Sequence, residues 1–186
     1  MSFPVKRRAT YEDLLLVPDR LVAQIIDGEL ITSPRPAPRH ARASSRLGGV
    51  LDGPFDRGAA GPGGWIILDE PELHLRSDVL VPDLAGWRRE RMPRLPDADY
   101  FELAPDWVCE VLSPSTEADD RVGKMPIYAR EGVQDAWLIN PIGQTVEVLR
   151  LQGSSWLVVA TQRGQQTVRV EPFDAIEIDI GTLWAD

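Results

Sequence analysis

The sequence predicts an α/β fold, a sandwich in which a mixed central β-sheet is flanked by helices and extended by added β-hairpins. Apolar runs of strand length alternate with segments of helical pattern along the chain. Glycine-containing turns join neighbouring runs as hairpins, and residues 106–139 follow the order strand, helix, strand. The 186 residues, 43% hydrophobic and 26% charged, indicate one globular domain spanning residues 1–186.

The N-terminal half is expected to begin with a short helix. Thr10 with an acid three positions later is a helix-capping pattern, and Pro18 ends the helix. The Asp-Gly pair at residues 27–28 separates two apolar runs, which is a strong hairpin signal. Residues 39–51 have a helical pattern, and a Gly- and Pro-rich loop then leads to two strands, at 65–75 and 79–85.

The C-terminal half contains the segments that we expect at the centre of the sheet. Residues 106–112 are apolar on both faces, which predicts a buried central strand. A helix to about Arg130 and a second buried strand at 136–139 follow, and together they predict a right-handed parallel crossover. Residues 145–161 alternate like an antiparallel hairpin, and residues 168–184 add one more strand and a short closing turn.

Composition restricts the location and the function. The single cysteine, Cys109, cannot form an intrachain disulfide, so a cytoplasmic location is expected. The N-terminus lacks the features of a signal peptide, and no stretch reaches the roughly 20 apolar residues of a membrane span. The net charge of −9 argues against a dedicated nucleic-acid binder, because phosphate contacts use Lys and Arg. A nucleic-acid function therefore requires the acidic residues to cluster around a metal and the basic residues to cluster elsewhere.

Two carboxylates within apolar strands are the strongest chemical signal. Asp83 shares its side of the strand with Val79, Val81 and Ala85, and Glu110 has apolar neighbours two residues away on both sides. An unpaired buried carboxylate costs several kcal/mol, and two on adjacent strands repel each other. A hard divalent cation removes both problems, since Mg²⁺ is held by one or two carboxylates with water and substrate phosphate.

Lys124 lies on the helix that follows the strand of Glu110. Its charge can stabilise an attacking hydroxide or neutralise a phosphate in the transition state. The residues alone leave structural alternatives open. Asp83 can cap a turn, Glu110 can pair with an arginine, and Lys124 can pair with Asp120 one helical turn earlier.

Several motifs resemble the Uma2 family (DUF820) of restriction-endonuclease-like proteins in the PD-(D/E)XK nuclease superfamily. They are Ile26–Leu30, Pro38–His40, Pro82-Asp83, Cys109–Thr116 (with the run EVLSPST), Asp120–Lys124, Tyr128, Gly132-Val133 and Ala136–Pro141. The resemblance runs from about Tyr11 to about Leu151. It implies a restriction-endonuclease-like fold and an endonuclease that hydrolyses DNA. It also implies a divalent metal, Mg²⁺ with Mn²⁺ as a possible substitute, at Asp83 and Glu110, with Lys124 as the third catalytic residue.

The chain departs from the family pattern at two positions. The superfamily usually has a lysine two residues after the acid, where this chain has Leu112, so the resemblance implies that the lysine has moved to Lys124. The family often has Glu where this chain has Gln24, and an amide is a poorer metal ligand than a carboxylate. Related nucleases commonly pair, and the hairpin at 145–161 offers an open edge, so we expect a homodimer.

Other charged residues are weaker candidates. Arg39, Arg42 and Arg46 have helical spacing, and Arg39 and Arg42 are the candidate DNA-binding residues, with a solvated helix face as the alternative. His40 is interpreted as a surface histidine near a helix cap that could approach substrate. Glu70, Glu72 and His74 share one strand face, and a solvated face is the preferred interpretation.

Two functional hypotheses follow from the sequence. The first is a Mg²⁺-dependent phosphodiesterase that acts on DNA, which Asp83, Glu110 and Lys124 favour. The second is a non-catalytic nucleic-acid-binding or assembly module that keeps the nuclease fold. Gln24 and the acidic net charge favour this second hypothesis.

Overall fold

The computed structural model describes residues 7–185, and its centre is a six-stranded mixed sheet in the order β10-β9-β8-β7-β6-β3. The strands are β3 (Trp65–Asp69), β6 (Leu84–Arg88), β7 (Trp107–Val111), β8 (Asp135–Asn140), β9 (Thr145–Gln152) and β10 (Ser155–Arg163). Only β7 and β8 pair in parallel in this sheet, and its other pairs are antiparallel. The predicted mixed sheet and the parallel pairing across residues 106–139 are therefore confirmed.

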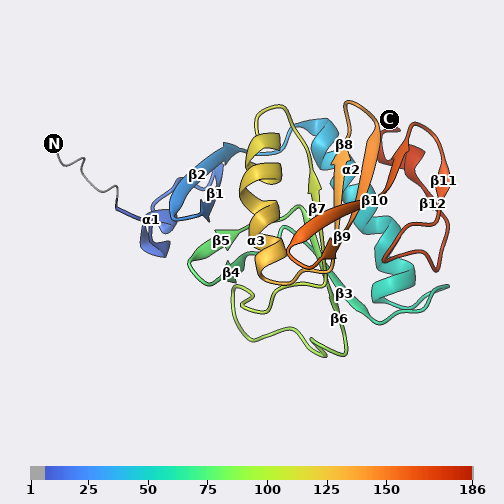
Figure 1. The fold of residues 1–186 in the computed structure, drawn as a ribbon, viewed down its shortest axis with the longest axis horizontal. Helices are drawn as coiled ribbons and strands as arrows, with labels where there is room; N and C mark the ends of the chain where they lie inside the picture. The colour runs from blue at the N-terminus through green and yellow to red at the C-terminus, as the bar shows by residue number, and fades with distance from the viewer. Residues whose placement is uncertain (1–6, 186) are drawn as a thin grey trace.

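A smaller sheet lies beside the N-terminal helix α1 (Tyr11–Leu15), at the blue end of Figure 1. Its order is β2-β1-β5-β4, with β1 (Leu21–Ile26), β2 (Glu29–Pro34), β4 (Leu73–Leu75) and β5 (Asp78–Leu80). Asp27 and Gly28 join β1 to β2 with positive φ angles of 51° and 81°. Tight hairpin turns require such angles, which is why the Asp-Gly pair predicted this hairpin correctly.

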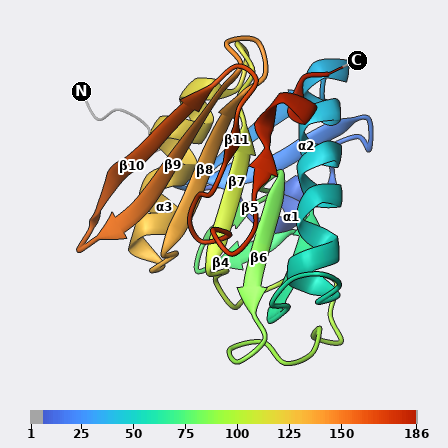
Figure 2. The same cartoon turned by 90° about the vertical axis from the view of Figure 1, so that its right-hand side faces the viewer.

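Helices cover the central sheet on both faces, as Figure 2 shows. Helix α2 (Pro38–Leu51) packs on one face and continues into a π-helical turn, Asp52–Asp56. Helix α3 (Met125–Arg130) covers the other face and follows a second π-helical turn, Asp119–Lys124. The chain closes with β11 (Thr167–Val168), β12 (Ile178–Asp179) and a 3-10 turn, Ile180–Leu183. Within residues 7–185, no helix has the length and apolar character to cross a membrane.

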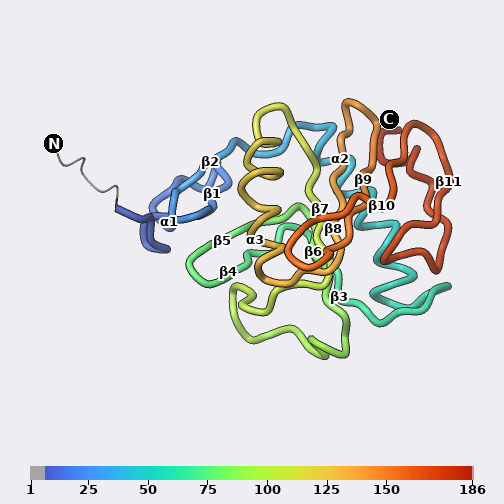
Figure 3. Tube along the Cα trace, in the orientation of Figure 1, coloured from blue at the N-terminus to red at the C-terminus, as the bar shows by residue number. Residues whose placement is uncertain are grey.

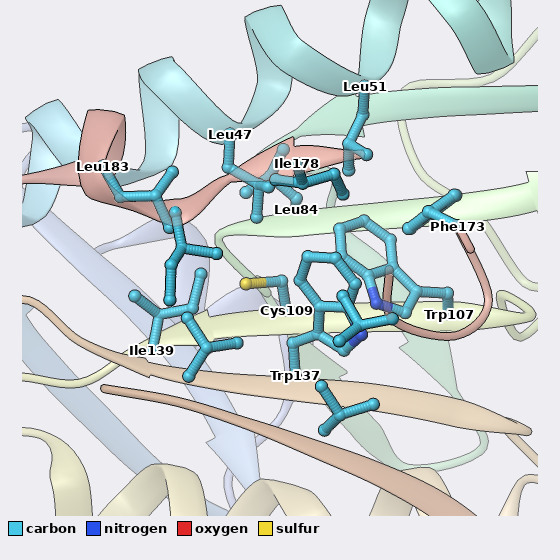
Figure 4. Packing of buried hydrophobic residues seen from close by; sticks show 14 of the residues in the cluster. Leu47, Leu51, Leu84, Trp107, Cys109, Trp137, Ile139, Phe173, Ile178 and Leu183 are labelled. Carbon is cyan, nitrogen blue, oxygen red and sulfur yellow. The ribbon is translucent and has the colours of Figure 1, made fainter. Parts of the chain in front are cut away.

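The central strand β7 separates two hydrophobic cores, because its side chains alternate between the two faces of the sheet. Trp107 and Cys109 face the α2 side, where they pack with Leu47, Trp137 and Phe173 (Figure 4). Val108 and Leu112 belong to the core on the α3 side, with residues of α3 such as Met125, Ile127 and Tyr128. Glu110 is two residues from Val108 along the strand, so its side chain points to the same face of the sheet, on the α3 side.

The two strands predicted at 65–75 and 79–85 are each interrupted at a proline. The first divides at Pro71 into β3 and β4, and the second divides at Pro82 into β5 and β6. The pairs Asp69↔Leu84 and Leu73↔Leu80 keep one register across the break, so the four strands form a single bent hairpin that changes sheet. Proline has no N–H for a ladder hydrogen bond, which explains the break.

The break at Pro82 corrects the predicted position of Asp83. Asp83 does not lie inside an apolar strand but in the gap between β5 and β6, at the junction of the two sheets. The connection from β6 to β7, residues 89–106, loops away from the sheet before it returns (Figure 3). Val111, the last residue of β7, donates its N–H to Asp83. The junction at Asp83 therefore lies next to the C-terminal end of β7 and to Glu110.

Candidate active site

A pocket of about 220 Å³ opens at the junction of the two sheets. Its walls come from the β1–β2 hairpin, the connector to α2, the gap between β5 and β6, and the segment that leads into the second π-helical turn. The polar side chains that reach into it include Gln24, His40, Asp83, Asp120 and Lys124. The fold therefore brings side chains from distant parts of the sequence to one place.

Lys124 is the centre of the charged groups around this pocket. Its ammonium Nζ lies 2.9 Å from Glu110 Oε2 and 2.9 Å from Asp120 Oδ1. The hydroxyl of Tyr128 donates to Glu110 Oε1 at 2.6 Å. The Lys124 ammonium therefore contacts Glu110, its partner in the catalytic hypothesis. It also contacts Asp120, its partner in the structural alternative.

The π-helical turn explains why Asp120 and Lys124 point inward together. Side chains four residues apart on a helix lie on the same face. Here that face is turned to the core, so that Asp120 is 3% and Lys124 5% exposed. Single π-helical turns inside helices occur frequently at functional sites. The sequence predicted a helix through these residues but carried no signal for its π-helical turn.

Asp83 is held by two contacts at the end of β7. Its Oδ2 accepts a hydrogen bond from the backbone N–H of Val111 at 2.6 Å. Its Oδ1 lies 3.2 Å from His40 Nε2. The side chain is 13% exposed and lines the pocket, so Asp83 keeps access to a ligand while its backbone contact fixes it next to Glu110.

His40 is a functional candidate that sequence reasoning underrated. It was interpreted as a surface histidine, but its side chain is only 12% exposed and contacts Asp83. Its Nδ1 is buried and has no hydrogen-bond partner within residues 7–185. His40 stands in the first turn of α2, and only the three-dimensional position of Asp83 shows that this turn faces the site.

The electrostatics of the site show an excess of negative charge. Burial raises the pKa of Glu110 to about 8, with further contributions from Asp120 and Asp83, although Lys124 and Tyr128 act in the opposite direction. Burial likewise raises the pKa of Asp120. Burial lowers the pKa of Lys124, but the three carboxylates outweigh it and raise this pKa above its ordinary value. One ammonium thus faces three carboxylates, an imbalance that a divalent cation would relieve.

The donor set suits a hard divalent cation that is completed by other ligands. Among residues 7–185, no three His, Cys, Asp or Glu side chains converge as a ready metal-binding group. Mg²⁺ does not need such a group, because one or two carboxylates with water and substrate phosphate hold it. Glu110 on β7, and Asp83 beside the end of β7, supply oxygen donors of this kind. The excess of negative charge around Lys124 favours a cation next to them.

The comparison with known proteins agrees with this geometry. The sequence pattern of Uma2, described as "Putative restriction endonuclease", matches residues 8–181. The chain belongs to the Uma2 family. The match extends beyond the resemblance seen up to about Leu151 and includes the strands of the C-terminal segment.

A solved structure has the same fold as this Uma2 chain. It is described as a "putative nuclease belonging to DUF820" from Anabaena variabilis, with 25% sequence identity and a TM-score of 0.74. The similarity covers 95% of this chain and 97% of that one, which confirms the restriction-endonuclease-like fold. No curated protein is significantly similar to the chain.

Gln24, the position at which this Uma2 chain departs from the family pattern, takes part in the backbone structure of the site. It is 8% exposed, and its Oε1 accepts a hydrogen bond from the N–H of Val81 at 2.8 Å. The hydrogen bond ties β1 to the gap that contains Asp83. An amide at this position therefore holds the wall of the pocket in place.

The remaining sequence candidates lie outside this pocket or at its rim. Arg39 and Arg42 are exposed and line a second cavity, of about 530 Å³, on the other side of the first turn of α2. Glu70 lines the first pocket. The solvated face expected for Glu72 and His74 is wrong, because Glu72 Oε1 accepts from the Tyr11 hydroxyl at 2.8 Å and lies 2.7 Å from His74 Nε2.

Proposed function

We propose that this Uma2 protein is a metal-dependent endonuclease that hydrolyses phosphodiester bonds in DNA. The observation that carries the proposal is the set of carboxylates around Lys124, whose ammonium contacts Glu110 and Asp120 and feels the charge of Asp83, while Asp83, Asp120 and Lys124 line the pocket. Unpaired buried charge is costly, so its retention indicates a ligand that makes use of it. Family membership and the similarity to a DUF820 protein described as a nuclease support this reaction class.

Asp83 and Glu110 would hold the metal, Mg²⁺ or Mn²⁺. The metal, when bound, supplies a Lewis acid for the phosphate and lowers the pKa of a water molecule. Lys124 cannot ligate a metal, since an ammonium has no lone pair, so its role is toward the phosphate or the attacking water. Asp120 would keep Lys124 protonated and paired if Glu110 held the metal.

Two further side chains position these groups. Tyr128 donates to Glu110 Oε1 and Lys124 to Glu110 Oε2, so Tyr128 would still hold the carboxylate if Oε2 exchanged Lys124 for the metal. His40 holds one oxygen of Asp83, and the Val111 N–H holds the other. Such contacts restrict the rotation of both carboxylates, and restricted ligands lose less entropy when a metal or a phosphate binds.

The second candidate function is a non-catalytic module that binds nucleic acid or an assembly partner. The observation that favours it is Gln24, an amide that is already engaged with the Val81 N–H and adds no charged ligand to the site. On this hypothesis the cluster around Lys124 stabilises the fold and no bond is cleaved.

Incubation with plasmid and single-stranded DNA in Mg²⁺ or Mn²⁺ tests the proposal. We expect cleavage by the parent protein, and a loss of about 100-fold or more in Glu110→Ala, because a metal ligand is removed. Glu117→Ala is the control, since Glu117 is a nearby acid that pairs with Arg121 and does not line the pocket. Equal cleavage by the parent and Glu110→Ala would overturn the proposal, and binding without cleavage would support the non-catalytic module.

A further inference from the structure

The depth of the candidate catalytic groups restricts the shape of the substrate. Glu110 is 1% and Lys124 5% exposed, and the pocket that Lys124 lines measures about 220 Å³. Pockets for drug-sized ligands measure roughly 300–1,000 Å³. The space therefore suits a phosphate with its sugar, whereas a stacked base pair with two backbones is too large for it.

The wall of the pocket is held by contacts that would have to break for it to open. The hairpin β1–β2 forms much of this wall, and it is paired to β5 through Ile25↔Val79. The Gln24 side chain adds a hydrogen bond to the Val81 N–H. Pro34 and Pro36, with fixed φ angles, stiffen the connector that continues the wall. This wall of the pocket is thus part of the folded structure.

The second cavity begins where the catalytic pocket ends. Ala37 and His40 line the pocket, and Pro38 and Arg39, in the same helical turn, line the cavity of about 530 Å³. Arg42, Gln144 and Trp184 also line this cavity. The first turn of α2 is the ridge between the two spaces, and its N-cap residue makes no side-chain capping bond. The backbone N–H groups at such a helix start favour an anion.

These features together match the requirements of an extended single strand. Proteins that bind single-stranded nucleic acid combine cationic side chains that follow the backbone with aromatic rings on which bases stack. Here the arginines and Trp184 line the second cavity, while the carboxylates lie in the first. Arg39 and Arg42 therefore lie outside the acidic pocket, while Arg35 lines it, so basic groups follow the proposed path in spite of the net charge of −9.

We propose that the substrate is a single strand, or a single-stranded end, of DNA that runs from the catalytic pocket across the first turn of α2 into the second cavity. Arg39 and Arg42 contact its phosphates, and a base packs against Trp184. The inference rests on the proposed nuclease function and adds the strandedness of the substrate and its path.

Binding measured in EDTA tests the path without any cleavage. The probes are a short fluorescent DNA strand and the blunt duplex of the same sequence, followed by fluorescence anisotropy. We expect the parent to bind the strand at least about tenfold more tightly than the duplex. Arg39→Ala with Arg42→Ala should weaken strand binding and reduce the salt dependence of log K by about 1.4, at roughly 0.7 for each lost contact. Arg46→Ala is the control, because Arg46 is exposed on α2 but lines neither cavity.

The outcomes separate this inference from the proposed function. Equal or tighter binding of the duplex overturns the inference even if the protein cleaves DNA. A loss of affinity in Arg46→Ala as large as in the double variant overturns the path through the second cavity. Preferential strand binding that depends on Arg39 and Arg42 supports the inference, even if the cleavage assay finds no activity.

Discussion

A lysine between two buried carboxylates acts as the counter-ion of both. The ammonium of Lys124 compensates Glu110 and Asp120 at 2.9 Å each, in a place where water is almost excluded. Removal of one member of a buried ion pair costs about 3–5 kcal/mol, because the other charge is left without a partner. The three charged residues therefore have to be understood as one unit, and substitutions at each of them should differ in their effects.

We predict that Asp83 and Glu110 bind one divalent cation and that Lys124 does not. Asp83→Asn and Glu110→Gln should abolish Mn²⁺ binding, since carboxylate oxygens are the ligands that this ion prefers. Lys124→Ala should leave Mn²⁺ affinity equal or slightly higher, because the competing positive charge is gone, while turnover falls. Titration calorimetry on the three variants measures this. Parent-like Mn²⁺ affinity in Glu110→Gln would show that Glu110 is not a ligand.

The raised pKa of Glu110 predicts how the metal-free protein responds to pH. Because its pKa rises from 4.5 to about 8 in the folded state, the fold favours the protonated acid. The associated stability is complete below about pH 4.5 and is lost as the pH rises through about 8. The pKa values of Asp120 and His40 are also raised, so these residues likewise make the fold less stable as the pH rises.

Glu110→Gln isolates the part of this response that belongs to Glu110. The amide is neutral at every pH, so the melting temperature in EDTA should fall less between pH 5 and pH 9 than that of the parent. Thermal unfolding at several pH values measures the difference. Identical pH profiles for the two proteins would contradict the assignment of the response to Glu110.

The sequence singled out Asp83, Glu110 and Lys124 as candidates, but it could not describe their contacts. Acids within apolar runs indicated burial, and both acids are indeed largely shielded. The contacts of Asp120 with Lys124 and of His40 with Asp83 depend on how segments far apart in the sequence meet. No local pattern encodes such a meeting, and for this reason His40 looked like a surface residue.

At the scale of elements, prediction succeeded where the local pattern alone determines the structure. The turn at residues 27–28 requires positive φ, and β7 is apolar on both faces, so both elements were evident. Prediction was wrong for the strands at 65–75 and 79–85. Their apolar pattern continues through Pro71 and Pro82, and only the tertiary structure shows that the bent hairpin changes sheet there. The break matters for function, because it brings Asp83 to the junction.

Gly86 in β6 illustrates how tightly the central sheet is packed. A Cβ at this position would lie 3.2 Å from Trp65 and 3.3 Å from Trp107, both of which are buried. Gly86→Ala should therefore destabilise the protein by about 1–3 kcal/mol through overpacking. Gly49→Ala is the control, since a Cβ there meets nothing within 4 Å and alanine favours the helix. Denaturant unfolding that ranks the two variants in the opposite order would contradict this account of the packing.

At the scale of the whole molecule, the open edge of the central sheet predicts self-association. Strand β10 is the last strand of this sheet within residues 7–185, and Leu157, Val158 and Val159 are 49%, 50% and 39% exposed. Unpaired backbone groups beside exposed apolar side chains invite pairing with a second copy. We predict a homodimer that joins through β10.

Light scattering at micromolar concentration measures the mass of the particle. A charge on the edge opposes strand pairing, so Val158→Lys should reduce the mass to that of one chain. Val122→Lys, at a residue that is 76% exposed on the helix, should leave the dimer intact. A parent mass equal to one chain, or a dimer that survives Val158→Lys, would contradict the prediction.

The ammonium of Lys124 has a consequence for the time at which the protein acquires its metal. Many small metalloproteins cannot fold before the ion arrives, so chelators denature them. In this chain the lysine already pairs with both Glu110 and Asp120, so we expect a newly made molecule to reach its final shape in a cell that is short of divalent ions. If the proposed function holds, the metal would switch on a protein that is already folded, and a chelator should stop cleavage without unfolding the chain.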